Sequence, residues 1–191
     1  MKSLDDRKRE LRGDVLSKRL EISEDEWQTK SEEINAHFTQ SDFYKDAVLI
    51  HSYVSMNHRN EVDTWNLITA MLADGKKIAV PVTNFMDSSL VHSEINSTKG
   101  LVPNKWGIYE PRQMQKVNIQ DLDIVVVPMA AADKKGNRLG YGKGFYDRFL
   151  SEIEAFKVGF VFNDFIFEEI PAENFDVRMD VIISEKGIIF A

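Results

Sequence analysis

The segment between residues 47 and 82 constrains the fold more than any other part of the chain, because it reads as strand, helix, strand. Residues 47–54 form a short, mostly apolar run without a helical period, as expected of a buried strand. Residues 65–75 carry apolar side chains at helical spacing and end in a glycine, and residues 77–82 form a second apolar run. Two consecutive strands joined by a helix are parallel neighbours in one sheet. This segment therefore predicts an α/β fold.

The rest of the chain continues the alternation of helical and extended segments. We expect an opening helix over the first two dozen residues and a second helix from Ser23, which has the spacing of a capping box with Glu26, to about Gln40. Further strands are expected at residues 123–128, 156–162, 181–183 and 188–190, and a further helix at residues 143–154. Residues 84–120 are polar and broken, which indicates an inserted irregular segment or hairpin.

These elements predict one domain over residues 1–191. The expected architecture is a three-layer α/β/α sandwich, with a mostly parallel, open, Rossmann-like sheet of six or more strands. Ligands of such sheets bind outside the carboxyl ends of the strands. Candidate site residues are therefore sought directly after the predicted strands.

Charge and composition exclude several classes of function. The 24 Lys and Arg residues and the 31 Asp and Glu residues give a formal net charge of −7, the wrong sign for a protein that holds a nucleic-acid backbone. No apolar run approaches the roughly 20 residues of a membrane-spanning helix, and the N-terminus has no secretory signal. The chain has no cysteine, which excludes disulfides and thiolate catalysis. We expect a cytoplasmic monomer that acts on small molecules, and not on nucleic acid or membranes.

Residues 136–148, GNRLGYGKGFYDR, follow the predicted strand at 123–128 and carry the strongest candidate site. Their alternating glycines permit positive φ angles and a close approach of a ligand to the backbone, while Arg138 and Lys143 supply positive charge. If a helix begins in this turn, its free N–H groups also favour an oxyanion such as phosphate. The spacing matches neither the P-loop nor the dinucleotide fingerprint. Glycine spacing alone leaves a flexible turn with solvated charges about equally acceptable.

The complete string at residues 137–148 closely resembles the signature of the 5-formyltetrahydrofolate cyclo-ligase family. Other blocks of the chain match the same family in order: residues 8–12, 53–55, 61–64, 107–111 and 176–180. The resemblance thus covers nearly the whole chain. Phe145 stands where relatives carry tyrosine or phenylalanine, and Phe175 stands where many relatives carry histidine, so a role for that imidazole is not available here.

The resemblance implies a reaction that uses ATP and magnesium to convert 5-formyltetrahydrofolate into 5,10-methenyltetrahydrofolate, with release of ADP and phosphate. A formamide oxygen is a poor leaving group. Transfer of the γ-phosphoryl group onto that oxygen lets the neighbouring nitrogen attack the formyl carbon, and ring closure then expels phosphate. The protein contributes positioning and charge stabilisation. The resemblance gives the catalytic roles to Lys143, Arg138 and Tyr146.

The resemblance also assigns binding residues. Those implied for ATP are Lys8, Arg12, Arg138, Leu139, Gly140, Tyr141, Gly142, Lys143, Gly144, Phe145 and Tyr146. Those implied for the folate are Tyr53, Met56, Glu61, Trp106, Tyr141 and Tyr146. The implied magnesium ligands are Asp147 and Asp176, since magnesium takes one or two carboxylates together with phosphate oxygens.

Simpler interpretations stay open for several of these residues. Lys8 lies on the apolar stripe of the first helix, where its stem can pack while its ammonium reaches water. Glu61 and Asp147 have positions in which acids commonly complement a helix N-terminus. Two other functions also remain compatible with the turn. One is a phosphate-binding α/β enzyme of another class, such as a sugar-phosphate isomerase, and the other is a non-catalytic nucleotide-binding protein.

Overall fold

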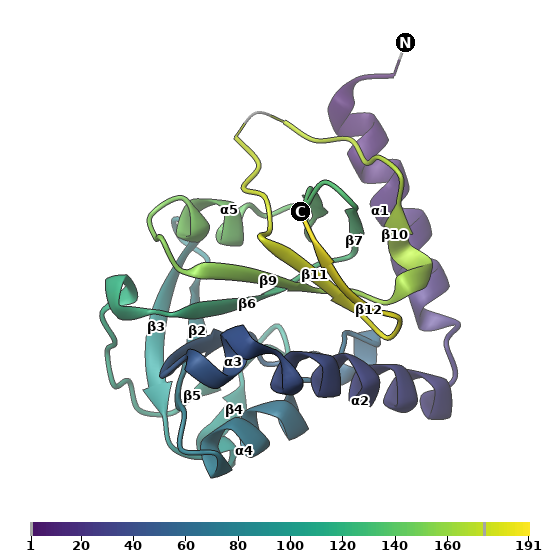
Figure 1. Ribbon diagram of the computed structural model, residues 1–191. Helices are drawn as coiled ribbons and strands as arrows, with labels where there is room; N and C mark the ends of the chain where they lie inside the picture. The colour runs from purple at the N-terminus through teal and green to yellow at the C-terminus, as the bar shows by residue number, and fades with distance from the viewer. Residues whose placement is uncertain (1, 174) are drawn as a thin grey trace.

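The computed structural model describes residues 2–173 and 175–191, and its centre is a seven-stranded mixed sheet (Figure 1). The strand order is β12-β11-β9-β6-β1-β2-β3. The strands span Leu49–Ser52 (β1), Lys77–Asn84 (β2), Ser89–Ile95 (β3), Ile124–Pro128 (β6), Phe156–Phe160 (β9), Val181–Ser184 (β11) and Gly187–Phe190 (β12). The inner strands pair in parallel, and the edge strands β3 and β12 are antiparallel to their neighbours. This confirms the predicted α/β fold.

Helices cover both faces of the sheet. They span Leu4–Leu20 (α1), Glu24–Gln40 (α2), Asp42–Asp46 (α3), Trp65–Ala73 (α4) and Phe145–Leu150 (α5). In Figure 1, α2, α3 and α4 lie on one side of the sheet and α5 lies on the other. Single turns of 3-10 helix occur at Asn57–Arg59 (η1), Thr98–Gly100 (η2), Ile119–Asp121 (η3) and Asn163–Phe165 (η4). No helix in the described residues is both long and apolar enough to cross a membrane.

The helix starts agree with the capping signals in the sequence. The hydroxyl of Ser23 accepts a hydrogen bond from the amide of Glu26 at 3.3 Å, so α2 begins where the capping box predicts. The predicted helix at residues 143–154 is shorter than expected and spans Phe145–Leu150 only. Gly142 and Gly144 have φ angles of +85° and +68°, which exclude helical backbone at these positions and delay the start of the helix.

The segment at residues 84–120 combines the expected hairpin with a strand that the sequence pattern did not show. The hairpin pairs β4 (Leu101–Pro103) with β5 (Tyr109–Pro111). Before it, β3 joins the main sheet antiparallel to β2. Because β3 is an edge strand with exposed and half-buried positions, it lacks the continuous apolar run that marks an inner strand. A second small sheet has the order β10-β7-β8, with β7 at Ala131–Asp133, β8 at Arg138–Leu139 and β10 at Ile166–Phe167. Its strands β7 and β8 follow β6 and lead into the glycine-rich turn.

Two histidines are buried in the core beneath α5. His51 on β1 is fully buried, His92 on β3 is nearly so, and their ring centroids lie 4.9 Å apart. Both rings also contact Phe149 of α5, at 5.0 and 4.0 Å between centroids. Burial lowers the pKa of His51 far below its ordinary value and lowers the pKa of His92 to about 4. The packing therefore requires both imidazoles to be neutral.

We expect this histidine pair to make the fold sensitive to mild acid. Unfolded histidine titrates near pH 6.5, whereas folded His92 titrates at about pH 4. Between these values the unfolded chain binds more protons, so the stability present above pH 6.5 is progressively lost as the pH falls. His92→Gln should flatten the decrease in melting temperature between pH 7 and pH 5. His58→Gln, which removes an exposed histidine, is the matched control. Equal pH dependence in wild type and His92→Gln would contradict the assignment.

Candidate active site

A cleft of about 500 Å³ opens where the inner strands end. Its walls are formed by residues at or after the carboxyl ends of β1, β2 and β6, by the glycine-rich turn, by the first half of α1 and by Glu173, Phe175 and Asp176. The strands β1 and β6 are parallel neighbours, so their carboxyl ends meet at the same edge of the sheet. The cleft thus lies where an α/β fold places its ligands.

Every candidate residue from the sequence lines this one cleft. The set comprises Lys8, Arg12, Tyr53, Met56, Glu61, Trp106, Arg138, Leu139, Gly140, Tyr141, Gly142, Lys143, Gly144, Phe145, Tyr146, Asp147 and Asp176. These residues come from five separated parts of the chain, so their convergence is a property of the tertiary structure. Their individual roles stay predictions.

A buried carboxylate fixes the start of the glycine-rich turn. Asp133, at the end of β7 (Ala131–Asp133), is fully buried and accepts hydrogen bonds from the backbone amides of Lys135 and Asn137. Its other oxygen accepts from the Asn137 side chain and from the amide of Ile170. Because one side chain accepts all of these hydrogen bonds, it fixes the conformation of the hairpin that leads to β8 (Arg138–Leu139).

Arginine side chains pass close to the backbone of the turn. Arg12 of α1 donates from Nε to the carbonyl oxygen of Gly140 at 2.7 Å. A Cβ atom on Gly140 would lie 2.8 Å from Arg138 Nη1, and one on Gly142 would lie 3.1 Å from the Arg12 guanidinium. The glycines are therefore needed for the approach of these cations as well as for positive φ.

Three ion pairs occupy the end of the cleft that the glycine-rich turn lines. Arg138 donates to Asp147 at 2.5 Å, and Lys8 donates to Asp176 at 2.6 Å and to Glu173 at 2.7 Å. Burial acts to lower the pKa of Lys8, but hydrogen bonds from its ammonium to the two carboxylates raise that pKa above its ordinary value. Lys8 is thus a charged residue inside the site, which excludes the interpretation that its ammonium points to water.

Three cations remain available to an anion in this part of the cleft. Burial lowers the pKa of Arg12, although a guanidinium stays charged at any physiological pH. The Nε atom of Arg138 is buried and has no hydrogen-bond partner in the described part of the chain. Lys143 lies exposed at the surface of the turn. Such a concentration of positive charge on an otherwise acidic protein is a local anion site.

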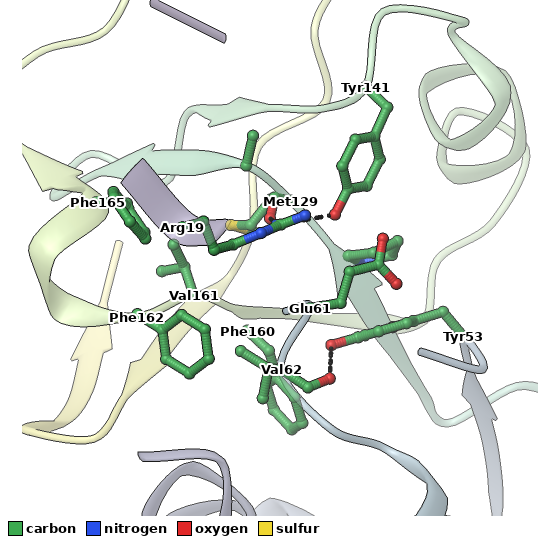
Figure 2. Close-up of a pocket in the computed structure, with 12 residues that line it drawn as sticks. Arg19, Tyr53, Glu61, Val62, Met129, Tyr141, Phe160, Val161, Phe162 and Phe165 are labelled. Atoms are coloured by element: carbon green, nitrogen blue, oxygen red, sulfur yellow. Dashed lines mark hydrogen bonds between the residues drawn. The ribbon is translucent and has the colours of Figure 1, made fainter. Parts of the chain in front are cut away.

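The opposite end of the cleft carries a buried carboxylate among tyrosines. Glu61 is 3% exposed, and one of its oxygens accepts a hydrogen bond from the amide of Met56 at 2.7 Å. Figure 2 shows this carboxylate between the rings of Tyr53 and Tyr141. Burial, followed by the charge of Glu61, raises the pKa of Tyr53, Tyr141 and Tyr146. The tyrosines are therefore neutral, and the site combines O–H groups with one negative acceptor.

Aromatic rings from two loops and from the start of α5 form the mouth of the cleft. Trp106 stacks on Phe85 with centroids 3.6 Å apart, and Phe145 meets Phe85 edge-on at 5.6 Å. Trp106 is still 45% exposed, so one surface of its indole remains accessible. Phe145 contributes through its ring, which agrees with either phenylalanine or tyrosine at this position. Such a wall suits a flat heterocycle.

Sequence reasoning missed several residues of the site. Phe85 lies in the turn after β2, and Glu173 and Asp5 lie in segments whose polar character gave no signal. Arg19, which lies outside the cleft but contacts Tyr141, was also missed, although its position in α1, seven residues after Arg12, places it on the same helical face. The helical spacing from Arg12 is the sequence signal that could have identified Arg19.

The donor set fits a magnesium ion that arrives with nucleotide phosphates. No group of three or more His, Asp or Glu side chains suited to a metal occurs among the described residues, so a preformed metal cage is absent there. Asp147 and Asp176 both line the cleft, and each is paired with a cation that phosphate oxygens can take over. Magnesium needs only one or two carboxylates when phosphates and waters complete its shell.

The chain is similar to folate enzymes in both sequence and structure. Its residues 5–185 match the model of the 5-formyltetrahydrofolate cyclo-ligase family. It is 30% identical over 156 residues to 5-formyltetrahydrofolate cyclo-ligase of Escherichia coli (strain K12), covering 76% of this chain and 84% of that protein. It is 25% identical over 193 residues to the Mus musculus cyclo-ligase, covering 94% of each. The NMR structure of Aquifex aeolicus 5,10-methenyltetrahydrofolate synthetase superimposes with a TM-score of 0.85 and 32% identity, covering 96% of this chain and 92% of that one.

We expect Gly142→Ala to damage the turn. The φ angle of +85° costs an alanine about 1–2 kcal/mol, and its Cβ would displace the Arg12 guanidinium. Urea unfolding should show the stability loss, and calorimetry with a non-hydrolysable ATP analogue should show weaker binding. Gly13→Ala is the control, because Gly13 lies in helical backbone of α1 with open space around it and should gain stability instead. Unchanged affinity in Gly142→Ala would contradict the anion site.

Proposed function

This chain belongs to the 5-formyltetrahydrofolate cyclo-ligase family, and we propose that its 500 Å³ cleft binds ATP at the glycine-rich turn and the folate beside Glu61. Its activity is that of the family, the cyclisation of 5-formyltetrahydrofolate to 5,10-methenyltetrahydrofolate. The family is one of ATP-dependent ligases. The observation that carries the assignment of the cleft is the convergence on it of every residue that the family signature implied.

The cationic end of the cleft suits a triphosphate. Arg12, Arg138 and Lys143 converge on it from α1 and from the glycine-rich turn, and the amides that precede α5 supply further N–H donors. The cationic groups of Lys143 and Arg138 contact oxygens of the γ-phosphoryl group that is transferred. Positioned cations stabilise the charge that this group spreads over its oxygens in the transition state.

The other end of the cleft suits a pterin. The N–H groups of a pterin can donate hydrogen bonds to the second oxygen of Glu61. Its flat ring fits among Tyr53, Tyr141 and Trp106. Burial of Glu61 makes such hydrogen bonds strong, because water competes poorly there. Met56 lies beside this carboxylate and supplies an apolar contact.

The reaction proceeds in two steps that balance. In the first, the formyl oxygen of the folate takes the γ-phosphoryl group of ATP, and ADP leaves. In the second, the neighbouring secondary amine nitrogen of the folate attacks the formyl carbon and loses its proton, and the carbon–oxygen bond breaks to release phosphate. Arg138, Lys143 and Tyr146 hold the phosphoryl oxygens through both steps. Bound magnesium, held by Asp147 and Asp176, would neutralise phosphate charge.

The other functions considered from the sequence are less well supported. A sugar-phosphate isomerase needs neither a second set of aromatic residues nor two acids at the phosphate end, and both are present here. We further propose that the protein is a cytoplasmic monomer. Light scattering should then give the mass of one chain, 22.0 kDa.

One assay tests the function directly. The purified protein, mixed with 5-formyltetrahydrofolate, ATP and magnesium, should produce the absorbance of the methenyl product together with one ADP for each molecule formed. Omission of ATP or addition of a chelator should abolish both signals. ATP hydrolysis without the methenyl product would overturn the proposal.

We expect the acids at the phosphate end to act on the phosphoryl step. Asp147→Asn and Asp176→Asn each keep a hydrogen-bonding oxygen for their cationic partner but lose the charge that a metal needs. Turnover should fall about 100-fold or more, the cost of losing one transition-state electrostatic contact. The magnesium concentration for half-maximal activity should also rise. Wild-type turnover in both variants would refute the metal assignment.

We expect Glu61→Gln to act on the folate and not on ATP. The amide cannot accept all the hydrogen bonds of the carboxylate, and an unpaired buried donor costs about 1–3 kcal/mol. Calorimetry should show weaker folate binding with little change for a non-hydrolysable ATP analogue. Asp63→Asn is a control on a nearby carboxylate that is buried among Ser55, Asn57 and Trp65 and does not line the cleft. Loss of nucleotide binding in Glu61→Gln alone would show that the cleft is oriented the other way.

A further inference from the structure

Arg19 is a buried cation outside the cleft that needs an explanation. It lies near the end of α1, is 3% exposed, and has no carboxylate within 4.0 Å among the described residues. A buried charge without an ion-pair partner is costly and persists where several hydrogen bonds compensate it. Arg19 is also absent from the residues that line the large cleft. The charge of Arg19 can therefore affect the cleft only through the residues that Arg19 contacts.

The guanidinium of Arg19 joins three segments of the site. Its Nε donates to the carbonyl oxygen of Arg59 at 3.0 Å, at the end of η1 and two residues before Glu61. Its Nη1 donates to the hydroxyl of Tyr141 at 3.0 Å, in the glycine-rich turn, and lies 3.5 Å from the carbonyl oxygen of Met129, directly after β6. Figure 2 shows the hydrogen bond to Tyr141.

The same end of α1 also holds the backbone before Glu61. Asn60, with a left-handed φ of 49°, donates from its side chain to the carbonyl oxygens of Arg19 and Ile22 at 3.0 and 3.1 Å. The indole of Trp27 donates to the carbonyl oxygen of Glu61 at 2.7 Å. The backbone at Glu61 is thus held by contacts to α1 and α2, and its carboxylate is held by the amide of Met56.

The hydrogen bond from Arg19 also fixes the direction of the Tyr141 hydroxyl. Because the hydroxyl oxygen accepts from the guanidinium, its own proton points away, toward Glu61 or a ligand. Burial and the charge of Glu61 raise the pKa of Tyr141, and the charge of Arg19 opposes them. A cavity of only about 10 Å³ separates Arg19, Glu61, Tyr53 and Tyr141, so the groups have little freedom to move apart.

We propose that Arg19 is a positioning residue that holds Tyr141 of the glycine-rich turn and the segment before Glu61 in the geometry that binds the folate. This inference rests on the proposed function of the cleft and extends it to a residue that touches neither substrate. Lys8, Arg12 and Arg19 share one face of α1, at spacings of four and seven residues. On this face Lys8 and Arg12 serve the phosphate end, and Arg19 serves the folate end.

The test compares Arg19→Met and Arg19→Lys with Lys18→Met. Lys18 is the exposed neighbour on α1, so its variant removes the same charge from the same helix without touching the network. Arg19→Met should raise KM for 5-formyltetrahydrofolate about 10-fold, the effect of losing a charged hydrogen bond, with KM for ATP changed less than about 2-fold. Arg19→Lys should recover part of the loss. Equal rises in both KM values, or values equal to those of Lys18→Met, would overturn the inference.

A double-variant cycle with Tyr141→Phe tests the route of the effect. If Arg19 acts through the Tyr141 hydroxyl, Arg19→Met should change KM for the folate less than about 3-fold in the Tyr141→Phe background. If the double variant raises KM for the folate by the full product of the two single effects, the proposed route is overturned. If Arg19→Met does not fold, the same cycle is measured with Arg19→Lys.

A second readout separates this inference from the function itself. Failure of the wild-type protein to form the methenyl product would refute the proposed function. Hydrogen exchange then decides the positioning role: Arg19→Met should speed exchange of the amides at residues 56–61 and 139–142 and leave β6 and β9 unchanged. No local change, or a change spread over the whole sheet, would overturn the inference.

Discussion

The parallel pairing of β1 with β6 is the constraint on which the rest of the structure depends. Both strands are fully buried, and their register places Ser52 beside Val126, so their carboxyl ends lie at one edge of the sheet. The segment after β1 carries Glu61, and the chain after β6 leads through a small sheet to the glycine-rich turn. The Glu61 segment and the glycine-rich turn therefore lie beside each other because two hydrophobic strands are neighbours.

The first helix, α1, adds positively charged side chains at this edge of the sheet. Its N-cap and its packing through Val15 hold it against the body of the protein, and the same face presents Lys8, Arg12 and Arg19 to three different loops. Loops are otherwise the parts of a fold with the least packing, and binding residues on them need outside support. Here a rigid helix supplies that support through hydrogen bonds to Gly140, Tyr141 and Arg59.

Sequence patterns predicted the inner strands well and the rest unevenly. An inner parallel strand such as β6 is apolar on both faces, and that pattern is visible in a single sequence. The edge strand β3 is only partly buried, and β8 and β10 are two residues long, so none of them has a period to detect. The start of α5 was predicted too early because Gly142 and Gly144 adopt positive φ angles, with arginine side chains close to both, and sequence spacing does not report this geometry.

By itself the sequence determined the α/β class, the position of the glycine-rich turn and, through the family signature, many of the residues that line the cleft. These depend on local hydrophobic periods and on residue types, which a linear chain displays directly. Only the tertiary structure decided which charges meet: Lys8 with Asp176, Arg138 with Asp147, and Arg19 with Tyr141. The contacts of Lys8 and Arg19 depend on how distant loops fold against α1, and the Arg138–Asp147 pair depends on the path of the glycine-rich turn between β8 and α5. A buried charge takes its partner from the geometry around it, and that geometry is set by the packing of the whole domain.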